Sequence, residues 1–152
     1  MRKVRLTFIA GMCLCFFLHG SVFAGEKPDE TVLQSLSKKL MENGVTQNEI
    51  ENLKAPLSDL LNKKADPAKI TSLVIALKAM NINGRLLADS IVYMKELTDA
   101  GEDPGSAGEF ILEAARSISE RGINGKNLIS EIKKTVMRRK QDIIGNSLKE
   151  QE

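Results

Sequence analysis

Residues 44–50 read GVTQNEI, and the same pattern returns as NINGRLL at residues 81–87 and as GINGKNL at residues 122–128. Each copy combines a glycine or asparagine, which suits a helix end, with one apolar residue and a Thr or Asn that suits a helix start. The copies begin 37 and 41 residues apart, and the Asp-Pro pairs at residues 66–67 and 103–104 are also 37 residues apart. This repeat predicts a unit made of a helix, a tight turn that holds one apolar residue, a capped helix and an Asp-Pro link.

Apolar residues follow a helical spacing through most of the chain. Six apolar stripes cover residues 33–40, 50–61, 70–77, 87–94, 110–118 and 128–136. No segment of useful length alternates with a period of two, so the sequence predicts no sheet. The expected fold is all-α, with about six helices arranged as three αα-hairpins, either in a repeat-like stack or in a compact bundle.

Residues at the ends of the stripes predict where helices begin and end. Gly44, Gly101 and Gly122 are expected to end helices, because glycine adopts the left-handed conformation that closes many of them. Pro56 is expected to kink or split the second helix. The expected N-caps and capping boxes are Thr46 with Glu49, Asp66 before Pro67, Asn83, Ser106 with Glu109, and Asn124.

The first 24 residues predict a cleavable signal peptide. Basic residues at positions 2, 3 and 5 precede an apolar run over residues 6–18, and Val22-Phe23-Ala24 suits cleavage after Ala24. The sequence therefore predicts a periplasmic or secreted protein, with a helical domain over residues 25–145 and a polar tail over residues 146–152. The alternative is an uncleaved signal that anchors the chain in the inner membrane.

Cleavage changes the composition, because both cysteines and the single histidine lie in the signal segment. The remaining 128 residues contain no Cys, His or Trp, and they carry 19 basic and 20 acidic residues. This composition disfavours a zinc site of the usual kind, a Ser-His-Asp arrangement and a cysteine nucleophile. The sequence accordingly predicts no enzyme, no metal and no cofactor, and the near-neutral charge argues against nucleic acid as a partner.

Two charged segments are candidate contact surfaces. The last helix is basic, and its candidate partner or lipid surface consists of Lys126, Lys133, Lys134, Arg138 and Lys140. Lysines beside an apolar arc can lay their stems on it and reach anionic headgroups or an acidic partner. The glycine-rich segment between two expected helices offers Asp99, Glu102 and Asp103 as a candidate loop contact.

The expected function is that of an exported, non-enzymatic helical interaction protein, such as an adaptor, a chaperone-like factor or an assembly accessory. Its partner would be another envelope protein or a peptide, bound in a groove between hairpins and on the basic last helix. The first alternative is a peripheral envelope protein that binds anionic lipid through its last helix. The second is a cell-wall hydrolase that uses the carboxylates of Glu109 and Glu113, which are one helical turn apart.

Overall fold

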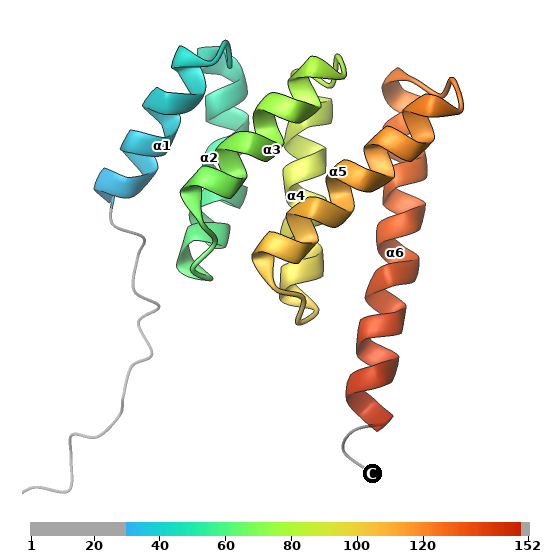
Figure 1. The fold of residues 1–152 in the computed structure, drawn as a ribbon. Helices are drawn as coiled ribbons and strands as arrows, with labels where there is room; N and C mark the ends of the chain where they lie inside the picture. The colour runs from blue at the N-terminus through green and yellow to red at the C-terminus, as the bar shows by residue number, and fades with distance from the viewer. Residues whose placement is uncertain (1–29, 150–152) are drawn as a thin grey trace, which may run out of the picture.

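The computed structural model describes residues 30–149, and this part of the chain is all-helical (Figure 1). Its helices are α1 (Glu30–Glu42), α2 (Gln47–Asn62), α3 (Pro67–Ala79), α4 (Arg85–Asp99), α5 (Pro104–Glu120) and α6 (Gly125–Lys149). The all-α prediction and its six helices are confirmed. The predicted signal peptide over residues 1–24 lies outside the described residues, as do residues 25–29 and 150–152.

The helices form two layers. α1, α3 and α5 lie next to one another in one layer, and α2, α4 and α6 do so in the other (Figure 1). α4 is the central helix, because it packs against α2, α5 and α6 and also contacts α3. Aliphatic side chains fill the space between the layers, and Leu53, Leu77, Ile91, Leu97 and Ile132 are completely buried. One hydrophobic core therefore runs through all three hairpins.

The turn inside each hairpin has the same geometry. Val45, Ile82 and Ile123 donate their backbone N–H groups to carbonyls five residues earlier, at N···O distances of 3.1, 3.1 and 3.4 Å. This closure is the Schellman motif, in which a left-handed residue ends the helix. The left-handed residues are Gly44 (φ 84°), Asn81 (φ 61°) and Gly122 (φ 78°). The repeat in the sequence thus marks the three turns within the hairpins.

The two links between hairpins close in the same way. Ala65 and Glu102 donate their N–H groups to carbonyls five residues earlier, at 3.0 and 3.1 Å. The residues before them, Lys64 and Gly101, have positive φ values of 62° and 109°. Glycine adopts such values without strain, whereas the Cβ of a lysine opposes them. Lys64 therefore stores strain at a position where the equivalent link has glycine.

Both Asp-Pro pairs begin helices with the proline in the first turn. The Asp66 carboxylate accepts the N–H of Ala68 at 2.8 Å, as expected for the N-cap of α3. The Asp103 carboxylate accepts the N–H of Ser106 at 3.0 Å and caps α5. The predicted capping box of Ser106 and Glu109 is therefore wrong, because α5 already begins at Pro104.

The predicted cap of α4 is also wrong. Gly84, rather than Asn83, is the N-cap of α4, and Glu49 from α2 accepts its N–H at 2.7 Å. A bond from a distant helix thus replaces the local side-chain cap. α6 begins at Gly125, directly after Asn124, as predicted. The side chain of Asn124 turns back to the preceding turn, where its amide donates to the Gly122 carbonyl at 3.3 Å and its oxygen accepts the Ser119 hydroxyl at 3.5 Å.

Pro56 and Gly145 both lie inside continuous helices. α2 runs through Pro56 without a break, and the proline is buried on the inner side of the helix. Packing of this face compensates for the backbone bond that proline cannot make. α6 continues through Gly145 to Lys149, so residues 146–149, which the sequence assigns to a polar tail, extend the helix.

Lys64→Gly is expected to raise the free energy of unfolding by about 0.5–1 kcal/mol, because it relieves the strain of a positive φ. This gain exceeds the cost of the extra freedom that glycine has in the unfolded chain. Lys38→Gly is a matched control, since Lys38 is an exposed lysine inside α1. There the same change should lower the free energy of unfolding by about 1 kcal/mol. Chemical denaturation of both variants checks the prediction, and a loss of stability in Lys64→Gly would contradict it.

Candidate functional site

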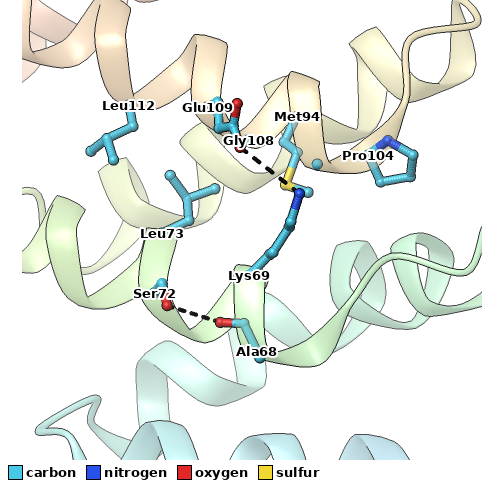
Figure 2. Close-up of a pocket in the computed structure, with 10 residues that line it drawn as sticks. Ala68, Lys69, Ser72, Leu73, Met94, Pro104, Gly108, Glu109 and Leu112 are labelled. Carbon is cyan, nitrogen blue, oxygen red and sulfur yellow. Dashed lines mark hydrogen bonds and ion pairs between the residues drawn. The ribbon is translucent and has the colours of Figure 1, made fainter.

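A pocket, here named the large hollow, lies in the groove between α3 and α5 with α4 at its base (Figure 2). Its volume is about 280 Å³. α3 contributes four residues, α4 contributes Met94, and the first three turns of α5 contribute the rest. The lining residues are Ala68, Lys69, Ser72, Leu73, Met94, Pro104, Gly105, Gly108, Glu109 and Leu112.

Two glycines on α5 keep this space open. A Cβ at Gly108 would lie 3.6 Å from the Cδ2 atom of Leu73 and from the Cε atom of Met94, which is ordinary contact. A Cβ at Gly105 would meet the Lys69 ammonium at 2.6 Å. Glycine inside a helix is less favourable than alanine by roughly 1 kcal/mol. Since alanine would fit at Gly108 and stabilise α5, packing alone does not account for the glycine.

A second pocket, here named the small hollow, lies between α1 and α3 and has a volume of about 130 Å³. Its lining residues are Val32, Ser35, Leu36, Lys39, Pro67 and Thr71. All but Lys39 are 37 positions before residues of the large hollow. The equivalent pairs are Val32 with Lys69, Ser35 with Ser72, Leu36 with Leu73, Pro67 with Pro104, and Thr71 with Gly108. The two hollows therefore occupy equivalent places in successive repeats.

One pair explains much of the difference in size. Thr71 is buried, and its hydroxyl donates to the backbone carbonyl of Pro67 at 2.8 Å. Its side chain fills the position that Gly108 leaves open in the next repeat. The large hollow thus occupies the equivalent recess and has no side chain at this position.

The polar groups of the large hollow are few and lie at its edge. The Lys69 ammonium is 3.8 Å from the Glu109 carboxylate, and their side chains are 57% and 78% exposed (Figure 2). Such a pair is loosely held, so each charge is open to a ligand. The Ser72 hydroxyl donates to the carbonyl of Ala68 at 3.0 Å. This chemistry suits an apolar group with a polar neighbour. Glu113, the other candidate carboxylate for hydrolysis, is exposed on α5 and does not line the hollow.

The acidic residues predicted as a loop contact all have partners within the chain. Asp99 pairs with Lys63 and, at 2.7 Å, with Lys95. Glu102 accepts two hydrogen bonds from an arginine of α6, at 2.9 and 3.2 Å. Asp103 caps α5. These contacts hold the link between the second and third hairpins, and a contact role for the three residues stays a prediction.

The predicted basic surface lies along α6. Lys126, Lys133, Lys134 and Arg138 are exposed, and Lys140 is half-buried. Lys134 pairs with Glu131 of the same helix at 2.6 Å. By contrast, Lys126, Lys133 and Lys140 form no ion pair with the part of the chain that the structure describes.

Arg139 belongs to the same basic run, but its side chain makes contacts within the fold. It binds Glu102, and its guanidinium lies 5.7 Å from the centre of the Phe110 ring. The hydrogen bond from Arg139 to Glu102 raises the pKa of the guanidinium, which therefore stays charged. This contact joins α6 to the start of α5.

Comparison with known protein families, with characterised proteins and with solved structures finds no match to this chain. Among residues 30–149, no helix has the length and apolar character needed to span a membrane. Over the same range, no three His, Cys, Asp or Glu side chains are grouped so that they could hold a metal ion. The two hollows and the lysines of α6 are the candidate functional features of the described residues.

The sequence contains a signal for the large hollow that the spacing of apolar residues does not reveal. Residues 104–108 read PGSAG and belong to the glycine-rich segment that the sequence places between two helices. In the structure they are helical, three residues apart and on the side of α5 that faces α3. Alignment of the 37-residue repeat places Gly108 opposite Thr71, which would have indicated a missing side chain.

Proposed function

We propose that this chain is an exported, non-enzymatic interaction protein that binds a partner protein or peptide along α1, α3 and α5. The observation that supports this proposal is the large hollow, an apolar recess with a lysine at its edge. Concave, mainly apolar sites with a few polar groups are typical of ligand recognition. The recess suits an apolar side chain of the partner better than a reacting substrate, because its polar groups are all at the edge.

The small hollow supports a peptide as the ligand. Neighbouring packed helices are about 8–10 Å apart, so the two hollows are separated by roughly that distance across α3. An extended peptide covers this distance in about three residues. A partner segment that crosses α3 can therefore place a large apolar side chain in the large hollow and a smaller one in the small hollow.

Gly108→Thr is expected to weaken partner binding about tenfold or more, since burying one apolar side chain contributes roughly 1.5–3 kcal/mol. The substitution copies the residue of the small hollow, where the threonine hydroxyl is satisfied by a carbonyl of its own helix. The free energy of unfolding should be maintained, because threonine is no poorer in a helix than glycine. Gly145→Thr is the matched control, since a Cβ there meets no atom within 4 Å.

Site-specific photo-crosslinking in the native envelope fraction tests the proposal. A photoreactive amino acid replaces Ser72 beside the large hollow or Lys54 on the other layer, and captured proteins are identified by mass spectrometry. We expect a discrete protein partner at Ser72 only. It should disappear with Gly108→Thr and persist with Gly145→Thr. Capture of a protein that persists with Gly108→Thr would contradict the proposal. Capture of lipid alone or of cell-wall fragments alone would also contradict it, and would favour the lipid-binding or the hydrolase alternative respectively.

A further inference from the structure

α6 carries lysines and exposed apolar side chains on one side. The residues of this surface, here named the α6 stripe, are Lys133, Met137, Lys140, Ile144 and Leu148, which follow one another at spacings of three or four residues. Residues with this spacing share one face of a helix. Met137, Ile144 and Leu148 are 43%, 47% and 62% exposed, the highest exposed fractions among the large apolar side chains of residues 30–149.

The charges of α6 are segregated around the helix. Asp142 is two residues from both Lys140 and Ile144, so it points to nearly the opposite side. Glu131 is engaged with Lys134, which lies outside the stripe. Lys133 and Lys140 have no ion pair among residues 30–149. The stripe is therefore cationic and apolar along its whole length, without an acidic residue of its own.

The position of this surface differs from that of the hollows. The C-terminal end of α6, which runs to Lys149, reaches beyond the ends of α4 and α5 (Figure 1). The stripe lies on α6, whereas both hollows lie along α3 in the other layer. A helix face that combines lysines with exposed apolar side chains is typical of helices that lie in a membrane interface.

We infer that the α6 stripe binds an anionic lipid surface. The three apolar side chains enter the boundary between headgroups and acyl chains, while the lysine stems lie along them and carry the ammonium groups to lipid phosphates. A second copy of the same face fits less well, because it would bring four unpaired lysines together. The helix lies on the membrane rather than across it, and the α1, α3 and α5 layer stays accessible to a protein partner.

The test uses a local signal, because the apolar run over residues 6–18 of the full chain can itself enter a vesicle. The chain has no tryptophan, so Ile144→Trp places a single fluorescent reporter in the stripe. Asp142→Trp places the same reporter on the opposite side. Each full-length variant is mixed with phosphatidylcholine vesicles that contain or lack phosphatidylglycerol, and emission and acrylamide quenching are recorded.

We expect a blue-shifted, quencher-protected emission for Ile144→Trp only with phosphatidylglycerol, and no such change for Asp142→Trp. Adding Lys133→Gln and Lys140→Gln should weaken binding about 25-fold, since each lysine near an anionic surface contributes about fivefold. Lys38→Gln with Lys54→Gln, on the first hairpin, should leave it unchanged. An emission from Ile144→Trp that is the same in both vesicle types would overturn the inference. So would a shift that depends on protein concentration alone, which would assign the stripe to a second copy.

Discussion

Glu49→Gln is expected to lower the free energy of unfolding by about 3 kcal/mol, because it removes a buried charge that joins two hairpins. Glu49 is only 5% exposed. One carboxylate oxygen accepts the N–H and hydroxyl of Thr46 at 2.9 and 3.0 Å and the ammonium of Lys78 at 2.9 Å. The other accepts the N–H of Gly84 at 2.7 Å. The carboxylate thus completes the capping box of α2 and also supplies the cap of α4.

The control is Glu51→Gln on the same helix. Glu51 forms an exposed pair with Lys54 at 2.7 Å, and such pairs contribute little to stability. Urea denaturation followed by circular dichroism measures both variants. Equal stability of Glu49→Gln and Glu51→Gln would show that the joint between the hairpins is not stabilising.

The same carboxylate predicts how stability depends on pH. Burial raises the pKa of Glu49, but hydrogen bonds from Gly84, Thr46 and Lys78 outweigh burial and lower it from 4.5 to about 2. A carboxyl whose pKa is lower in the folded state stabilises the fold above its ordinary pKa. This stabilisation, about 3 kcal/mol for such a shift, is lost as the pH falls from about 4.5 toward 2.

Comparison of the wild type with Glu49→Gln isolates this group. The pKa of Asp99 is also lowered, by hydrogen bonds from Lys63 and Lys95, so other carboxyls contribute to the acid loss in both proteins. We expect the difference between the two stability curves to be largest above pH 5 and to shrink as the pH falls. Curves that stay parallel over the acid range would contradict the assignment.

Glu49 also shows which parts of the fold could be predicted from sequence. The capping box with Thr46 was predictable, because both partners lie within one turn and follow a known local pattern. The bonds to Lys78 and Gly84 were not, since they join residues 29 and 35 positions apart. For the same reason Asn83 looked like the cap of α4. Asparagine does favour the N-cap position, but here the Glu49 carboxylate of another hairpin accepts the N–H of the next residue, Gly84.

The α6 surface and the large hollow also differ in how far local sequence predicts them. The basic surface of α6 could be predicted because all its residues lie on one helix and share a helical period. The use of Arg139 to bind Glu102 could not, because it depends on how α6 packs against the start of α5. The large hollow is even harder to predict from the sequence, since it arises where Gly108 faces Leu73 and a side chain is absent. An absent side chain becomes a recess only once two helices are placed side by side.

Ile91→Ala is expected to lower the free energy of unfolding by about 3 kcal/mol, because it leaves a cavity that the surrounding core cannot fully fill. Ile91 is completely buried on α4, the helix that contacts the other two hairpins. Val92→Ala is the adjacent control: Val92 is 36% exposed, and its change should stay within about 0.5 kcal/mol.

The number of steps in the unfolding transition shows whether the hairpins unfold together. In stacked helical hairpins each unit is stable mainly through its neighbours, so a defect in the central helix weakens both sides. A single transition at lower urea concentration is therefore expected for Ile91→Ala, with circular dichroism and Tyr93 fluorescence changing together. Tyr93 lies on α4 itself, packed against the core. If helicity were instead lost in two steps, with the tyrosine signal following only one, the hairpins would unfold separately and the continuous core would not act as one cooperative unit.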